Sequence, residues 1–311
     1  MEPQNGGVHR TPQGIHHVTG IVRDPGANAD FYADTLGLRF VKRTVDFEDR
    51  FSYHLHYGDA TGSAGSVLTF FPFREEPDGR VGRPQIASAR LAVPEGSFDY
   101  WRDRFDARGV EYGEATTQFG TRVLPVRDPD GTRLELAAES GHVEPWDGGP
   151  VPAKYGVRGV TGVSLLSASP FVTASLLETF GFERGGQEGD RVRYRTPRGV
   201  VDILDRETPF GREGAGTVHH VAFGVEEEAT LHEWRDLLAD RDDVRVSYVK
   251  DRRFYHSLYA RDGGGILFEL ATEPVDLTRD DPAPGDRLYL PPEFESDRET
   301  IESQLPPLEA P

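Results

Sequence analysis

Cysteine is absent from the 311-residue sequence. Disulfide bonds, thiolate metal sites and cysteine nucleophiles are therefore excluded. The sequence also lacks an uninterrupted run of 18 apolar residues, so we expect no transmembrane helix. The first residues, MEPQNGGVHRTPQ, are polar and lack the apolar segment of a signal peptide. These absences together predict a cytoplasmic protein.

Lysine is scarce as well. Three of the 35 basic residues are lysines, the acidic residues number 53, and the formal net charge is −18. A strongly acidic surface repels polyanions, which disfavours nucleic-acid binding. Salt screens such self-repulsion to within about 3 Å at 1 M. We therefore hypothesise a salt-adapted, halophilic protein; the alternative is an ordinary acidic protein from a GC-rich genome.

Internal repeats are the strongest pattern present. Three pairs of segments resemble each other: 126–139 with 260–273, 98–105 with 231–238, and 14–22 with 156–164. The chain therefore consists of two related halves, which join near the Pro- and Gly-rich segment EPWDGGPVPAK at 144–154.

Each half divides again into two units that begin with a strand, continue with an amphipathic helix and end with three strands. The predicted helices cover 26–36, 97–109, 169–181 and 228–241. We therefore predict an α+β fold of four βαβββ modules, paired into two half-open barrel domains at 10–145 and 153–276. Residues 277–311 are Pro-rich and acidic, and we expect a C-terminal strap with one short helix near 297–304.

Two histidine pairs and one glutamate are candidates for chemistry. His16 and His17 lie in the first strand of the first module, His219 and His220 lie in the first strand of the fourth, and Glu269 lies in its last strand. Such groups are costly to bury in apolar strands unless something compensates them, and a metal ion would compensate all three positions. Because side chains alternate along a strand, only one histidine of each pair can face the metal, and the alternation does not say which. A core histidine satisfied by hydrogen bonds is the competing interpretation.

Glu135 occupies the place of Glu269 in the second module. The strand expected beside it has Arg158-Gly159 where the first module has His16-His17. We therefore predict that Glu135 forms an ion pair with an arginine, and that the chain binds one metal ion.

The sequence resembles the vicinal-oxygen-chelate superfamily, which includes glyoxalases, bleomycin-resistance proteins and extradiol dioxygenases. Within it, IHHVTGIV, LGLRFVKRTVDF, YHLHYGD, VHHVAF, KDRRFYHSLYARDGGGILFELATE and LPPEF resemble the hydroquinone-type ring-cleaving dioxygenases in order and spacing. The resemblance extends from about residue 12 to the C-terminus. It implies glyoxalase-like domains, an Fe(II) cofactor with Mn(II) as an alternative, and cleavage of a hydroquinone or catechol-type ring by O₂.

The resemblance also implies which residues form the site. The implied metal ligands are His17, His220 and Glu269. The implied pocket residues are His16, Thr19, His219, Arg252 and Tyr259. His56, His256 and Ala260 depart from the family pattern, which leaves the substrate shape open. The roles of His54, His56 and His256 also stay open, and His54 and His56 share one strand face as pocket wall or surface.

Elementary chemistry agrees with this ligand set, because two imidazoles and a carboxylate suit non-haem Fe(II) and leave coordination positions free. His16 and His219 are either acid/base groups or hydrogen-bond partners of the ligands or Thr19. Arg252 either stabilises an anionic substrate or forms a solvent-exposed ion pair. Tyr259 either donates a hydrogen bond to a substrate oxygen or packs as a core aromatic residue.

Two other functions remain candidates. One is a glyoxalase- or epimerase-like metalloenzyme without O₂ chemistry, because one fold supports both activities. The other is a metal-free resistance protein that binds a quinone or a drug. For the dioxygenase we expect a small aromatic diol and O₂ as partners, assembly into a homo-oligomer, and neither nucleic-acid nor membrane binding.

Overall fold

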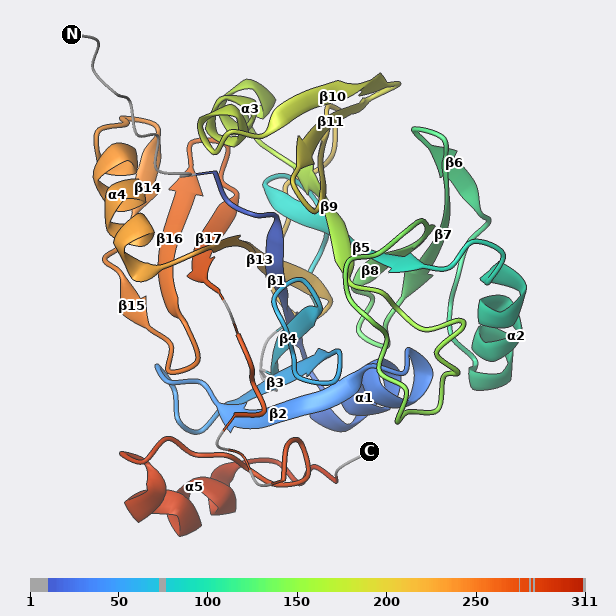
Figure 1. The fold of residues 1–311 in the computed structure, drawn as a ribbon, viewed down its shortest axis with the longest axis vertical. Coiled ribbons are helices and arrows are strands. Elements are labelled where there is room, and N and C mark those ends of the chain that lie inside the picture. The colour runs from blue at the N-terminus through green and yellow to red at the C-terminus, as the bar shows by residue number, and fades with distance from the viewer. Residues whose placement is uncertain (1–10, 73–76, 274, 280, 282, 310–311) are drawn as a thin grey trace, which may run out of the picture.

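The computed structural model describes residues 11–72, 77–273, 275–279, 281 and 283–309. Within this part of the chain, seventeen strands join into one continuous, strongly curved sheet, with helices packed around its outside (Figure 1). None of the described helices is long and apolar enough to cross a membrane.

The first two modules follow the predicted order of elements. The first contains β1 (Ile15–Val22), α1 (Pro25–Ala29), a π-helical segment (Asp30–Thr35), β2 (Arg39–Val45), β3 (Tyr53–Gly58) and β4 (Val67–Pro72). The second contains β5 (Gln85–Val93), α2 (Phe98–Arg108), β6 (Thr116–Gln118), β7 (Thr121–Arg127) and β8 (Arg133–Ala138). The helix expected over 26–36 is thus present, but its second half is wound as a π-helix.

The last two modules repeat the order. The third contains β9 (Val160–Leu166), α3 (Pro170–Thr179), β10 (Glu183–Glu188), β11 (Arg191–Thr196) and β12 (Gly199–Leu204). The fourth contains β13 (Thr217–Val225), α4 (Glu228–Ala239), β14 (Val244–Val246), β15 (Lys250–Asp251), β16 (His256–Asp262) and β17 (Leu267–Thr272). The α+β fold of βαβββ modules is therefore confirmed.

The sequence predicts strands near 111–117 in the second module and 244–249 in the fourth, and both are shorter in the structure. The first is reduced to β6, and the other, β14, ends at Val246 and is followed by the two-residue strand β15. The hydroxyl of Ser247 accepts a hydrogen bond from the backbone N–H of Tyr259 at 3.0 Å, a position that a backbone carbonyl takes in a regular ladder. The side chain thereby interrupts the strand.

Two equivalent helices show why the modules fold alike. α2 buries Phe98, Trp101 and Phe105, and α4 buries Leu231, Trp234 and Leu238. In both helices the apolar residues recur three or four positions apart, so they form one stripe that packs on the sheet.

Strand pairing joins the first module to the fourth and the second to the third. β1 pairs antiparallel with β13, while β5 pairs antiparallel with β9. Each of these strands also pairs in parallel with the last strand of its own module, β1 with β4, β5 with β8, β9 with β12, and β13 with β17. The two ends of the chain therefore meet in one half-barrel, and the two middle modules form the other.

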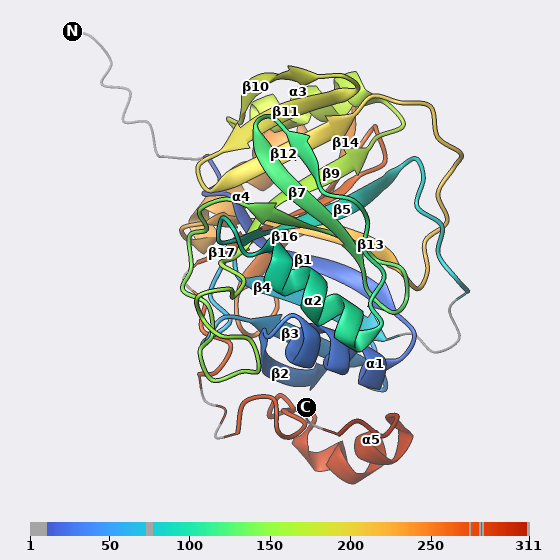
Figure 2. The same cartoon turned by 90° about the vertical axis from the view of Figure 1, so that its right-hand side faces the viewer.

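The strap lies along the outer side of β2, with α5 (Arg298–Gln304) after a short 3₁₀ turn (Glu295–Asp297) (Figure 2). The helix falls within the predicted 297–304. The buried ammonium of Lys42 contacts the Asp281 carboxylate at 3.0 Å, and Arg43 donates hydrogen bonds to the carbonyls of Asp286 and Leu308. The strap is therefore fixed to β2 by charged contacts rather than by packing alone.

Candidate metal centre

Strand register brings the three candidate ligands onto one face of the sheet. His17 of β1 lies opposite Ala222 of β13, and Ala222 lies opposite Glu269 of β17. His220 is two residues from Ala222 on β13, so its side chain emerges on the same face. Residues that are far apart in sequence are thus placed together by the pairing of the first and fourth modules.

The donor atoms of these residues converge on one point. Oε2 of Glu269 lies 3.2 Å from Nε2 of His17 and 2.8 Å from Nε2 of His220. One ligand atom from each residue lies within 4.8 Å of the others, and all three side chains are buried. Among the described contacts, Glu269 Oε2 makes no hydrogen bond of good geometry, although both imidazoles lie close to it. Lone pairs aimed at a shared point, rather than at one another, fit a bound cation.

The protonation states also fit a cation. Burial lowers the pKa of His220 to about 4, although Glu269 acts in the opposite direction. Burial by itself would raise the pKa of Glu269, but His17 and His220 outweigh it and hold that pKa well below its ordinary value. Metal ligands must be deprotonated, and at neutral pH these two residues are a neutral imidazole and a carboxylate.

His16 and His219 are each the extra residue of a β-bulge. The register between β1 and β13 skips His16 on one strand and His219 on the other. As a result, Nδ1 of His16 lies 2.8 Å from Nδ1 of His17, and Nδ1 of His219 lies 2.7 Å from Nδ1 of His220. Strict alternation would have turned the first histidine of each pair away from the second. The bulges instead place it where it can orient its neighbour.

Thr19 forms a polar chain along the cavity wall. Its Oγ1 lies 2.9 Å from Nε2 of His220 and 2.9 Å from Oγ1 of Thr69. Thr69 Oγ1 in turn lies 3.0 Å from Nε2 of His54. A hydroxyl is thus held beside the atom of His220 that points toward the shared donor position.

Arg252 and Tyr259 reach the same cavity from the fourth module. Nε of Arg252 donates to the Tyr259 hydroxyl at 3.2 Å, and Arg252 also contacts Glu48 at 3.1 Å. Burial, with a further contribution from Glu269, raises the pKa of Tyr259 far above its ordinary value. The phenol is therefore neutral and can donate a hydrogen bond.

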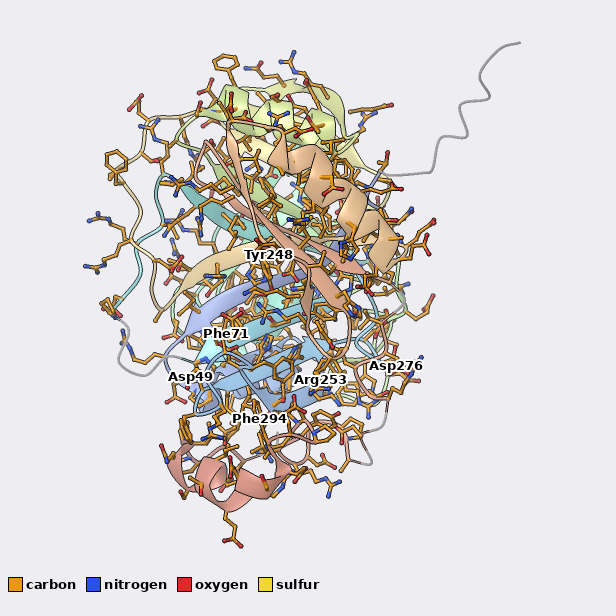
Figure 3. The ribbon with its side chains drawn as sticks, turned by 90° about the vertical axis from the view of Figure 1, so that its left-hand side faces the viewer. Asp49, Phe71, Tyr248, Arg253, Asp276 and Phe294 are labelled. Carbon is orange, nitrogen blue, oxygen red and sulfur yellow. The ribbon has the colours of Figure 1, made fainter. Side chains whose placement is uncertain are left out.

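The cavity has a volume of about 30 Å³, which suits a metal ion with small ligands. The residues that line it include Thr19, His17, His220, Arg252 and Tyr259, but not His16, His219 or Glu269. Its further lining residues are Phe71, near the end of β4 (Figure 3), and four that the sequence did not assign to the site, Asp46, Phe47, Phe254 and Tyr255.

Of the three histidines left open, His54 and His56 line the cavity, with ring centroids 4.0 Å apart. Their spacing of two on one strand was the signal for a shared wall. His256 faces the other way, with Nε2 3.6 Å from Glu228. Tyr255 lies between strands, where periodicity gives no orientation, yet its ring is 5.5 Å from that of His17.

The equivalent position in the middle modules has a different composition. Glu135 lies 3.5 Å from Arg90 and 3.8 Å from Arg191, so the predicted ion pair with an arginine is confirmed. The prediction that Arg158-Gly159 occupies the position equivalent to His16-His17 is wrong by three residues. The bulge and register of β9 against β5 match Thr161-Gly162 to His16-His17, because Gly162 lies opposite Arg90 as His17 lies opposite Ala222.

A family model described as the Glyoxalase/Bleomycin resistance protein/Dioxygenase superfamily matches residues 14–136. A Bacillus subtilis protein provisionally named ring-cleaving dioxygenase MhqO is 39% identical, over 95% of this chain and 96% of its own length. The chlorohydroquinone/hydroquinone 1,2-dioxygenase of Sphingobium indicum is 30% identical, over 86% of this chain and 88% of its own.

Solved structures of other proteins also superpose on this chain. A crystal structure from Bacillus subtilis, provisionally described as a dioxygenase, superposes with a TM-score of 0.92 at 38% identity, and covers 97% of this chain and 99% of its own. Glyoxalase I from Zea mays gives a TM-score of 0.63 at 13% identity, over 83% of this chain and 92% of its own, and therefore supports the fold alone.

Proposed function

Since the chain belongs to the ring-cleaving dioxygenases of the glyoxalase/bleomycin resistance protein/dioxygenase superfamily, we propose that it opens the ring of a hydroquinone- or catechol-type diol with O₂ and Fe(II). The observation that carries the proposal is the buried set of two imidazoles and one carboxylate with converging donor atoms. Such a set is typical of non-haem Fe(II) sites with open positions, and Mn(II) has similar ligand preferences.

We propose His17, His220 and Glu269 as the ligands. They supply one negative charge, so a singly deprotonated diol would bring a divalent site to neutrality. Bound Fe(II) supplies the redox chemistry by which an electron-rich ring reacts with O₂. The absence of cysteine suits this chemistry, because no thiolate ligand is exposed to oxidation.

The remaining residues have proposed roles that follow from their contacts. The imidazoles of His16 and His219 fix the ring orientation of the ligands through their Nδ1 contacts. The Tyr259 hydroxyl donates a hydrogen bond to a substrate oxygen, and the Arg252 guanidinium stabilises negative charge on it. Thr19 positions a second polar contact beside His220.

Phe71 and Phe254 bound the cavity with apolar surface that suits an aromatic ring. At about 30 Å³ the cavity is smaller than a ring, so substrate entry requires these side chains to move.

The domain boundaries at 145 and 153 and the assembly into a homo-oligomer remain predictions from the sequence.

Oxygen uptake tests the proposal. The protein is loaded with Fe(II) under anaerobic conditions and then given hydroquinone, catechol and ring-substituted diols in an oxygen electrode. We expect consumption of one O₂ per diol and loss of the aromatic absorbance. Turnover of a hemithioacetal without oxygen uptake would support the glyoxalase-like alternative instead. Tight quinone binding by the metal-free protein, with no turnover after loading, would support the resistance protein.

A further inference from the structure

The middle half-barrel contains a second cavity at the position equivalent to the metal centre. It has a volume of about 280 Å³. The residues that line it include Glu135, Ser88 and Arg191. By strand register, these residues correspond to Glu269, His220 and His54, respectively, in the half-barrel formed by the first and fourth modules. No histidine lines this second cavity, and Arg90 and Arg191 approach Glu135, so a metal ion is not expected there.

The wall of the second cavity carries opposed positive charges. Arg127 of β7 lies directly opposite Arg133 of β8, and like charges facing each other across a ladder are destabilising. Arg206, on the segment after β12, lines the same cavity. Partial burial and the proximity of Arg127 and Arg206 lower the pKa of Arg133. Four arginines and two glutamates line this cavity, although the whole chain carries a net charge of −18.

Three of the four arginines have carboxylate partners. Arg127 contacts Glu111 at 3.1 Å, Arg206 contacts Asp190 at 3.6 Å, and Arg191 contacts Asp202 at 2.8 Å. Arg133 has no ion pair with any residue that the structure describes, and its buried Nε has no hydrogen-bond partner there. The cavity therefore presents one guanidinium whose charge is not balanced by a neighbouring carboxylate.

From these observations we propose that the second cavity binds a small aromatic carboxylate. One uncompensated guanidinium matches one negative charge, and a carboxylate accepts two parallel hydrogen bonds from it. The apolar part of the wall, formed by Tyr112, Pro125, Val126, Leu134 and Leu204, accommodates a ring. A volume of about 280 Å³ is near the lower end of roughly 300–1,000 Å³ for small-molecule sites, which favours a single ring.

The internal repeat supports a specific role for Arg133. Arg127 has its counterpart in Arg261, and each donates to a carbonyl in the following turn, Gly131 and Gly265 respectively. The counterpart of Arg133 in the fourth module is Leu267. The fold thus accepts leucine at this position, and the arginine is a feature of the second cavity.

Calorimetric titration of benzoate into the full-length protein, freed of metal by a chelator, tests the proposal. We expect one benzoate per chain, no binding of the neutral isostere benzamide, and at least tenfold weaker binding of acetate. Arg133→Gln and Arg133→Leu should each raise the dissociation constant at least tenfold. Neither variant should lower the melting temperature of the free protein, since each removes the repulsion from Arg127.

Two control variants locate the ligand. Arg261→Gln, the matched change in the fourth module, and His220→Ala, in the metal centre, should bind benzoate as the parent protein does. Unchanged affinity in both Arg133 variants would overturn the proposal. Loss of binding in His220→Ala would also overturn it, because the carboxylate would then occupy the metal centre. Equal affinity for acetate and benzoate would overturn the assignment of an aromatic ligand.

Discussion

At the scale of single residues, the neutral phenol of Tyr259 offers the most direct test of the proposed chemistry. Its hydroxyl contacts Arg252 and its ring centroid lies 5.7 Å from that of His220, so it lies beside the proposed ligands without being one. Tyr259→Phe removes the donor and keeps the ring. We expect kcat to fall roughly 10²-fold, the size typical for loss of one transition-state hydrogen bond. Steady-state oxygen uptake measures this, and an unchanged kcat together with full iron content would contradict the role.

The buried imidazoles predict acid sensitivity of the metal-free protein. Burial lowers the pKa of His16 and His56 to about 3 and that of His220 to about 4, whereas an unfolded chain has histidines near 6.5. At pH values between the native and the unfolded pKa, the unfolded state binds more protons than the native state. The free energy of unfolding therefore falls as pH falls from about 6.5 to 4. Asp128 acts oppositely, because burial raises its pKa to about 6.

Urea unfolding of the metal-free protein across this pH range measures the effect. His56→Phe keeps an aromatic ring and removes one titrating group. We expect the variant to lose less stability than the parent protein between pH 6.5 and 4. Parallel curves for the two proteins would show that His56 does not contribute.

The sequence predicted the three proposed ligands, which the structure places together, but not the geometry around them. Alternation could not choose between His16 and His17, and it did not anticipate that His16 and His219 are bulge residues. A bulge depends on how a strand pairs with its partner, which a local pattern does not contain. The three-residue error at Arg158-Gly159 has the same origin, because similarity between segments did not include the register.

At the scale of elements, a buried ion pair links the strap to β2. Lys42 is fully buried, contacts Asp281 at 3.0 Å, and lies 5.1 Å from the ring centroid of Phe254, which lines the metal cavity. Asp281→Asn removes the carboxylate of this ion pair. Removing one partner of a buried pair costs about 3–5 kcal/mol. We expect a loss of this size in urea unfolding, together with a raised KM.

A double variant is the matched control. Lys42→Met with Asp281→Leu removes both charges and keeps apolar volume, so most of the stability should return. If Asp281→Asn alone unfolds like the parent protein, the ion pair does not hold the strap.

Most helices and strands could be predicted from periodicity, and two of the exceptions have local causes. The fourth module loses part of one strand because the hydroxyl of Ser247 takes a backbone position in the ladder. The first helix turns into a π-helix after Ala29. The spacing of hydrophobic residues does not distinguish an α-helix from a π-helix over so few residues.

At the scale of the whole molecule, the acidic composition predicts dependence on salt. With a net charge of −18 and only three lysines, repulsion between surface charges should destabilise the protein in dilute buffer. We expect the melting temperature to rise steadily with KCl into the molar range, where screening acts within about 3 Å. A melting temperature independent of KCl would contradict the halophilic hypothesis and favour an ordinary acidic protein.

The pairing of modules assigns different roles to the two half-barrels. The repeat and the histidine pairs could be read from the sequence, and so could the expectation that the chain's two ends meet at one site. The second cavity could not, because Arg127, Arg133 and Arg206 become neighbours only through the pairing of strands and the path of the chain after β12.

The central claim is that one metal centre, built from the first and fourth modules, performs the chemistry. Iron content after anaerobic loading and gel filtration tests it most directly. The account predicts one iron per chain in the parent protein, none in Glu269→Gln, and one in Glu135→Gln, the matched change in the middle modules. Two irons in the parent protein, or one iron retained in Glu269→Gln, would contradict it.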